Sequence, residues 1–139
     1  MRAIQEAVAA CLQERTGVKT VLDRALCRVY PMLAVSVRED GTTLLAGGKQ
    51  AEHKYLVTVT AASDRDRAGN TELLASLPPV LLRGIPMERE GEVRVLHPLN
   101  ICTEGEELTF VLALCVPVPQ PLKPGETEPG IMEVLHMEI

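Results

Sequence analysis

The sequence predicts an α+β fold: a mainly antiparallel sheet with two helices packed on one of its faces, followed by a proline-rich C-terminal arm. Two amphipathic helical patterns and several segments of alternating apolar and polar residues predict one domain over residues 1–117. A change of composition after Val116 predicts the arm over residues 118–139. The chain has 139 residues, of which 46% are hydrophobic, and this is enough for one core.

The first helix is predicted over residues 3–15. Its apolar residues recur at the spacing of one helical stripe, and they are Ile4, Ala7, Val8, Cys11 and Leu12. Gly17 is expected to end the helix, because glycine tolerates the left-handed conformation found after helix C-termini.

Three segments in the first half of the chain are predicted to be strands. Residues 18–22 form a short strand with a less regular pattern. Residues 32–38 and 52–61 alternate clearly between apolar and polar side chains, which indicates strands with one buried face. These two longer strands are expected to form a hairpin.

A wide loop is predicted to join the two strands of that hairpin, over residues 40–48. Asp40 and Gly41 favour turns, and Leu44 and Leu45 give the loop an apolar middle. We name Leu44 and Leu45 as candidate contacts with another subunit or a partner.

The second helix is predicted to follow the polar break at residues 63–67. Asn70 or Thr71 is its expected N-cap, since both side chains can accept hydrogen bonds from the free N–H groups of a first turn. The leucine-rich pattern runs to about Leu77. The two prolines that follow predict a kink or a second helical turn after it.

Two further strands are predicted over residues 93–96 and 108–116. The second segment is strongly apolar and rich in β-branched residues. It is therefore expected to be a central strand that is covered on both faces.

The arm contains five prolines between residues 117 and 129 and ends in a second strand-like segment over residues 131–139. This segment either folds back on its own sheet, remains disordered, or adds to the sheet of an adjacent subunit or partner. We favour the intermolecular form, because the prolines separate the segment from the domain. Its candidate contact residues are Ile131, Met132, Val134, Leu135 and Met137.

Charge and aromatic content argue against several classes of nucleic-acid-binding protein. The net charge is −5, with 19 acidic and 14 basic side chains and no basic cluster. Aromatic residues make up only 2% of the chain, too few for a surface on which bases stack. The composition therefore indicates no tight or sequence-specific binding of DNA.

The four cysteines, Cys11, Cys27, Cys102 and Cys115, form no CxxC motif. We interpret them as reduced thiols of a protein made in the cytoplasm, and we expect Cys11 and Cys115 to be buried because each lies in an apolar run. The N-terminus lacks the apolar core of a signal peptide, and no apolar run approaches the length of a membrane span.

No pattern of catalytic or ligating residues emerges from the sequence. The histidines His53, His97 and His136 are far apart, and no serine lies in a GxSxG motif. Residues 46–49 (AGGK) lack the spacing of a phosphate-binding loop. We therefore expect no catalytic residue, no cofactor and no metal, and predict that the protein is not an enzyme.

The order of these elements and three strand segments resemble the tail terminator proteins of tailed phages and prophages, especially those of Gram-positive hosts. The segments are residues 29–35 (VYPMLAV), 54–59 (KYLVTV) and 108–112 (LTFVL), and the resemblance spans residues 1–117. The family often carries more aromatic residues in its strands, and the proline-rich arm lies outside the resemblance.

The resemblance implies a structural virion protein without chemistry. Its members form a ring, expected here to be a hexamer, which caps the tail tube, ends its polymerisation and joins the tail to the neck or head. The implied partners are copies of the chain itself, the tail tube protein, the neck or head-completion protein and, in contractile tails, the sheath. DNA would pass through the ring without sequence-specific binding, and no membrane would be involved.

Two other functions are compatible with the same features. One is a small α+β adaptor, or an assembly protein of a secretion or injection system. The other is a small enzyme with a site that the motifs do not reveal, for which His97 or the acidic residues before the last strand are the candidates.

Overall fold

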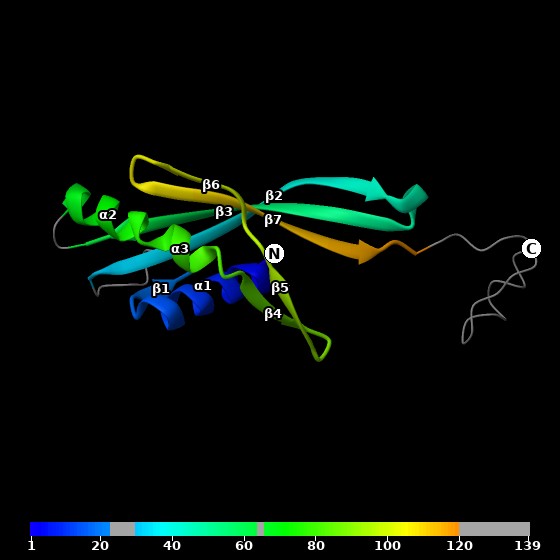
Figure 1. Cartoon of the computed structure of the whole chain (residues 1–139), viewed down its shortest axis with the longest axis horizontal. Helices are drawn as coiled ribbons and strands as arrows, with labels where there is room; N and C mark the ends of the chain where they lie inside the picture. The colour runs from blue at the N-terminus through cyan, green and yellow to red at the C-terminus, as the bar shows by residue number, and fades with distance from the viewer. Residues whose placement is uncertain (23–29, 64–65, 120–139) are drawn as a thin grey trace, which may run out of the picture.

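The computed structural model of the chain describes residues 1–22, 30–63 and 66–119. Its elements follow the order α1 (Arg2–Thr16), β1 (Lys19–Val21), β2 (Met32–Leu45), the 3₁₀ turn η2 (Ala46–Gly48), β3 (Gln50–Ala62), α2 (Asp66–Ala75), α3 (Leu77–Leu81), β4 (Ile85–Arg89), β5 (Glu92–Leu96), β6 (Leu99–Glu104) and β7 (Glu107–Pro117). The predicted α+β class, with helices on a mainly antiparallel sheet, is confirmed (Figure 1).

The main sheet has five strands in the order β1-β2-β3-β7-β6. β1 runs parallel to β2, and the other neighbouring strands are antiparallel. β4 and β5 form a separate antiparallel hairpin, and β4 lies against α1. The long β2-β3 hairpin and β7 are therefore the centre of the structure.

One face of the main sheet, which we call the helix-side face, packs against the helices. Residues directly opposite each other on neighbouring strands share a face, and two such rows are Val35-Val59-Leu108 and Val37-Val57-Phe110. Ile4, Val8 and Leu12 of α1 and Leu74, Leu77 and Leu81 of α2 and α3 belong to the same buried cluster. The core consequently lies between the sheet and the three helices, and apart from Phe110 its fully buried side chains are aliphatic.

α1 follows its sequence prediction closely. Four of the five predicted stripe residues are buried, and Ala7 is partly buried against the same cluster. Gly17 has a φ of 73° and donates its N–H to the carbonyl of Gln13, so it ends the helix as expected.

The second helix begins earlier than predicted, at Asp66, so Asn70 and Thr71 lie inside it and do not cap it. The predicted interruption is confirmed, because α2 ends at Ala75 and α3 begins at Leu77. Pro78 and Pro79 lie in the first turn of α3, where a missing N–H breaks no helical hydrogen bond.

The predicted wide loop over residues 40–48 is wrong, because β2 continues to Leu45 and only η2 forms the turn. The pairing with β3 shifts between Glu39 and Thr42. Gly41, with a φ of 115°, lies in this irregularity, so Asp40 and Gly41 mark a β-bulge within a strand and not a turn. A bulge and a turn use the same residue types, and the sequence signal does not separate them.

β7 is an interior strand of the sheet, as predicted, but it is fully covered on only one face. Leu108, Phe110 and Leu112 are buried on the helix-side face, whereas Val111 and Ala113 on the opposite face are partly exposed. β4 and β6 were not predicted at all. The expectation that 131–139 forms a strand lies outside the described residues.

Replacement of Phe110 by Ala is expected to lower the free energy of unfolding by about 3–5 kcal/mol, because it removes the largest fully buried side chain and leaves a cavity. Val111→Ala, one residue along β7 and on the opposite face, is the matched control and should cost less than about 1 kcal/mol. Urea denaturation followed by far-UV circular dichroism measures both. Equal losses for the two variants would contradict the one-sided core.

Candidate functional site

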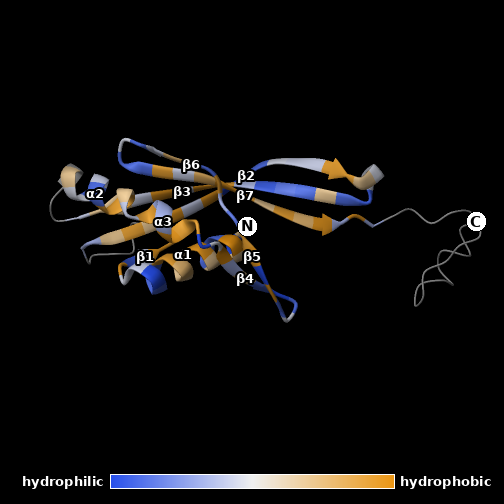
Figure 2. Ribbon diagram, in the orientation of Figure 1, coloured by the Kyte–Doolittle hydropathy of each residue, from blue (hydrophilic) through white to orange (hydrophobic). Residues whose placement is uncertain are grey.

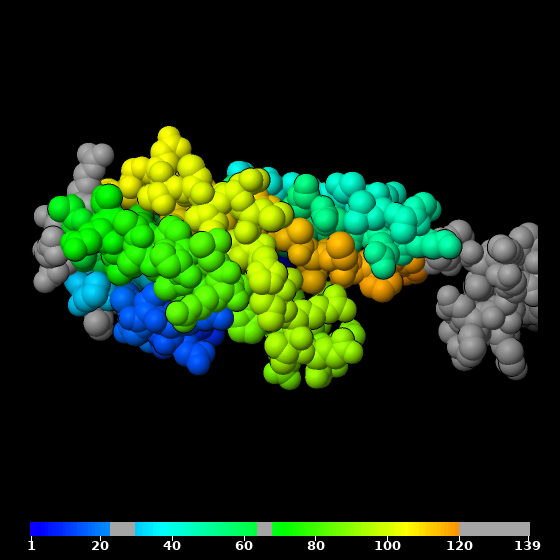
Figure 3. Space-filling view, viewed as in Figure 1, coloured from blue at the N-terminus to red at the C-terminus, as the bar shows by residue number. Residues whose placement is uncertain are grey.

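The strands of the main sheet are longer than the helices that cover them. α1 has 15 residues and spans about 22 Å, whereas β2 has 14 residues and spans about 45 Å. The far ends of β2, β3 and β7 therefore extend beyond the helices (Figures 1 and 3). We call this projection the tongue and define it as residues 39–45, the turn η2, and residues 50–54 and 113–117.

An apolar strip continues from the core along the helix-side face of the tongue. Leu114 and Ala51 are buried there, Val116 is partly buried, and Leu44 at the far end is 66% exposed. The register places Ala51 opposite both Leu44 and Val116, so these three side chains lie in one row across the tongue. Figure 2 shows hydrophobic colour at the ends of β2 and β7, on either side of a more polar β3.

Leu45, which is 36% exposed, lies on the opposite face of the tongue from Leu44. The two leucines are thus brought together at the tip but point to different sides. Their prediction as a loop was wrong, whereas their role as contacts stays a prediction. Ile131, Met132, Val134, Leu135 and Met137, the other predicted contacts, lie outside the described residues.

A trough separates the base of the tongue from the β4-β5 hairpin. It consists of two adjoining hollows of about 320 and 410 Å³ that share Arg89. The first is lined by Met1, Ala3, Ile4, Tyr55, Met87, Glu88, Arg89 and Leu114, and the second by Arg89, Glu90, Glu92, Arg94, Val116 and Pro117. Figure 3 shows the hairpin standing beside the end of β7.

The trough is better suited to a polypeptide surface than to a small substrate. Arginine and glutamate side chains alternate along the hairpin, so the trough carries no strong charge of one sign. Arg94 already donates a hydrogen bond to the carbonyl of Cys115 at 3.4 Å, which ties the hairpin to the tongue. The floor is apolar through Leu114 and Val116, as expected of a contact surface for another protein.

The hairpin adds exposed apolar side chains that the sequence analysis missed. Val93 and Val95 are 66% and 51% exposed on its outer face, while Ile85 and Met87 are buried on its inner face. The alternation of Val93 and Val95 with charged neighbours indicates an exposed apolar face of this strand as well as the strand itself.

The face of the main sheet opposite the helices, which we call the open face, has no helix packed on it among residues 1–22, 30–63 and 66–119. Its central row is Arg38-Leu56-Val111-Leu99, and the next row is Ser36-Thr58-Thr109-Cys102. Leu99 is 48% exposed. The open face thus carries small polar side chains with apolar side chains among them.

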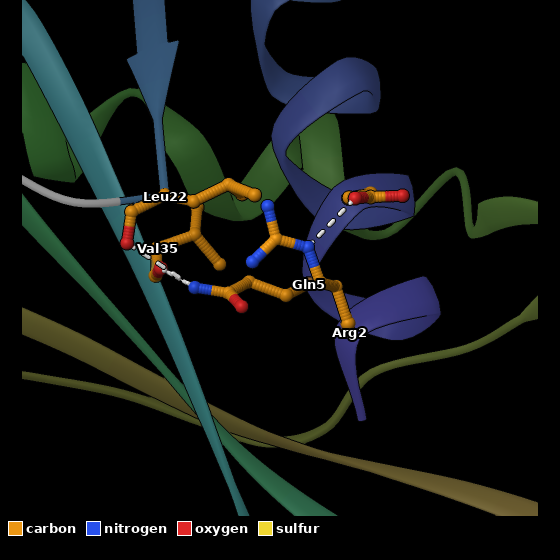
Figure 4. A network of polar contacts seen from close by, with 5 residues as sticks. Arg2, Gln5, Leu22 and Val35 are labelled. Carbon is orange, nitrogen blue, oxygen red and sulfur yellow. Dashed lines mark hydrogen bonds and ion pairs between the residues drawn. The ribbon is translucent and has the colours of Figure 1, made fainter.

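Gln5 of α1 marks the point where the edge of the main sheet changes. Its side-chain amide donates both hydrogens, one to the carbonyl of Leu22 at 3.2 Å and one to the carbonyl of Val35 at 2.8 Å (Figure 4). β1 pairs with β2 only from Met32 to Ala34, so the amide replaces the next hydrogen bond of that ladder.

The side chains with possible chemistry are dispersed in the structure. The described residues contain no group of three or more His, Cys, Asp or Glu that could hold a metal ion. His53 Nδ1 lies 3.1 Å from Thr42 Oγ1 on the exposed tongue, and His97 is in a different region, beside Gly84. In the acidic turn, Glu106 accepts a hydrogen bond from the amide of the buried Asn70 at 2.9 Å.

The prediction that Cys11 and Cys115 are buried is confirmed for Cys11 and wrong for Cys115. Cys11 is buried on α1, as expected, whereas Cys115 is exposed, because alternation along β7 directs it to the open face. Cys102 is also exposed, and these three cysteines are free thiols. Burial raises the pKa of the Cys11 thiol, an effect that Arg15 partly offsets and Glu14 adds to.

Alkylation by iodoacetamide at pH 8 is expected to modify Cys102 and Cys115 in the folded protein and to leave Cys11 unmodified until the chain unfolds. Peptide mass spectrometry checks each site separately. Rapid native alkylation of Cys11 would contradict its burial.

Because the pKa of Cys11 is raised in the folded state, its ionisation in the unfolded chain should favour unfolding as the pH rises above the ordinary value of 9.0.

The substitution Gln5→Leu is expected to lower the free energy of unfolding by about 1–2 kcal/mol, since two carbonyls at the sheet edge lose their donor. Arg2→Ala is the control three residues earlier, where an exposed ion pair with Glu6 is lost and the cost should stay below about 0.5 kcal/mol (Figure 4). Denaturant titration measures both, and a neutral Gln5→Leu would show that water replaces the amide without loss.

No helix in the described part of the chain is both long and apolar enough to cross a membrane. No protein-family model matches the chain, and no curated protein sequence matches it.

Proposed function

We propose that the chain is a structural subunit of a phage-type virion: a tail terminator that assembles as a hexameric ring on the last layer of the tail tube. In this role it ends tube polymerisation, joins the tail to the neck or head, and catalyses no reaction. The observation that carries the proposal is the tongue, a three-stranded extension of the sheet that ends in the exposed Leu44 and Leu45.

The tongue exposes apolar side chains to solvent unless another protein contacts it. Every residue of β2 from Arg38 to its end at Leu45 is exposed, so this half of the strand contributes little to the core. A long strand with apolar side chains at its exposed end invites association with other chains. A subunit that assembles with copies of itself gives such an extension a use.

A head-to-tail contact is the arrangement that fits a ring. The tongue projects from one side of the body, and the trough, the open face and the β4-β5 hairpin offer different surfaces for it to meet. Contacts between two different surfaces of the same chain generate a closed ring when the rotation between subunits completes a circle. Growth of the tube then ends if one face of the ring matches the tube and the opposite face does not.

The partners in this proposal are further copies of the chain, the tail tube protein, the neck or head-completion protein and, in a contractile tail, the sheath. The complete chain would act in the virion after synthesis in the cytoplasm of the bacterial host. The net charge of −5 suits a channel through which DNA passes without adhering.

The double substitution Leu44→Ser with Leu45→Ser is expected to weaken ring assembly about tenfold or more, because an apolar contact at each subunit interface would be lost. Truncation of a well-packed interface contact costs about 1–2 kcal/mol, and 1.4 kcal/mol corresponds to about a tenfold change in affinity. Leu82→Ser is the matched control, since Leu82 is 69% exposed at the end of α3, away from the tongue. Size-exclusion chromatography with light scattering measures the mass of each variant.

The wild-type chain should in addition cap tubes of tail tube protein, which electron microscopy shows as shorter tubes with a ring at one end. A wild-type monomer that never caps tubes would contradict the proposal. An oligomer that forms but leaves tube length unchanged would favour an adaptor of another assembly, such as a secretion or injection system.

A further inference from the structure

The trough between the tongue and the β4-β5 hairpin has an apolar floor and a charged rim. Leu114 and Val116 form the floor. Five charged side chains of the hairpin line the rim, and they are Glu88, Arg89, Glu90, Glu92 and Arg94. An apolar centre inside a polar rim is the usual layout of a protein interface. The trough therefore fits a protein segment that presents apolar side chains with a charged side chain beside them.

The charges at the turn of the hairpin have no partners within residues 1–22, 30–63 and 66–119. There, the side chains of Arg89, Glu90 and Glu92 form no ion pair and no hydrogen bond. Glu90 and Glu92 lie on either side of Gly91, and Arg89 precedes them. With two carboxylates and one guanidinium, the turn is locally negative and can receive a cation.

The tip of the tongue, which we define as residues 44–49, has the complementary composition. Leu44 and Leu45 are its exposed apolar side chains, and Ala46 beside them is exposed too. Lys49 is the single charged residue of the tip. It is exposed and forms no ion pair with another described residue. The tip thus combines an apolar end with one unpaired cation.

The tip cannot occupy the trough of its own chain. Gln50 and Ala51, which lead away from the tip, pair with Pro117 and Val116, so one continuous ladder holds the tip in line with the floor of the trough. Figure 3 shows the tip at the far end of the tongue, away from the hairpin. A tip that lies in the trough therefore belongs to a second copy of the chain.

The dimensions of the two surfaces allow this contact. Residues 39–45 of β2 extend about 23 Å at the rise of a β-strand, so the tongue can reach a neighbouring body. The two hollows of the trough measure about 320 and 410 Å³. Pockets of about 300–1,000 Å³ hold small molecules, and each hollow consequently has room for the few side chains of the tip.

We propose that the tip of one copy inserts into the trough of the next copy, with Leu44 on the apolar floor and Lys49 beside Glu90 and Glu92. The contact joins two different surfaces. It leaves the trough of the first copy and the tip of the second copy free, so the same contact repeats head to tail. The inference rests on the proposed assembly of the chain with copies of itself, but not on a role in a phage tail.

Charge reversal on each side of the contact tests it. Lys49→Glu places a carboxylate against the acidic turn, and the double variant Glu90→Lys with Glu92→Lys places two cations against Lys49. Each should weaken self-association about tenfold or more, because like charges are brought together. Lys19→Glu is the matched control, since Lys19 is exposed on β1, away from the tongue and the trough, and should leave association unchanged. Sedimentation velocity measures association, and circular dichroism checks that each full-length variant is folded.

An equimolar mixture of the two reversed variants separates a direct contact from a general effect of charge. In alternating order, the reversed tip of one variant meets the reversed turn of the other, and the unchanged Lys49 meets the unchanged Glu90 and Glu92. The mixture should therefore associate within about threefold of the wild type. Each reversed residue changes the net charge of −5 by two, to −7 in one variant and −1 in the other, so the two variants do not attract each other through their net charge.

The outcomes for this contact and for the proposed function are distinguishable. Association of wild-type strength in both reversed variants would place the contact between copies on another surface, such as the open face, and overturn the inference. A mixture that associates no better than its components would also overturn it, while a wild-type ring that caps tubes would leave the proposed function standing. A wild type that stays monomeric would overturn both.

Discussion

The packing of aliphatic side chains between the main sheet and α1 is the interaction on which the other elements depend. α1 contacts β2 and β4, and it lies beside α3 and β1 as well. Arg15 near its end donates to the carbonyls of Val80 at 3.0 Å and Gly84 at 2.7 Å, which fixes the connection between α3 and β4. The position of one helix thus determines where the β4-β5 hairpin stands and how wide the trough is.

The same packing sets the limit of the body. Leu112 and Leu114 on β7 are still buried, whereas Val116 two residues later is partly exposed and Pro117 is exposed. The sheet continues past this limit because its backbone hydrogen bonds extend as far as Leu45, Gln50 and Pro117. Beyond Leu114 and Ala51, backbone pairing contributes more to the tongue than side-chain burial does, and this difference separates a part that stabilises the fold from a part available for association.

Sequence reasoning succeeded where burial is one-sided and regular. α1, the first half of β2, β3 and β7 each show a period that matches their buried face. It failed where a strand is exposed on both faces or interrupted: the far half of β2 shows no alternation, and Pro86 obscures the alternation of the buried Ile85 and Met87 in β4. The exposed leucines were recognised without their strand, and Cys115 was misplaced because an apolar run does not reveal which face each residue takes.

The difference in length between strands and helices also affects which substitutions the chain can accept. A change at Phe110 or Leu33 must preserve volume and shape, since neighbours from several elements surround the side chain. A change at Thr43 or Glu52 in the tongue meets only neighbouring strands and solvent. Mutation can therefore alter the tongue while the body keeps its fold, so related chains could acquire new binding preferences without rebuilding their cores.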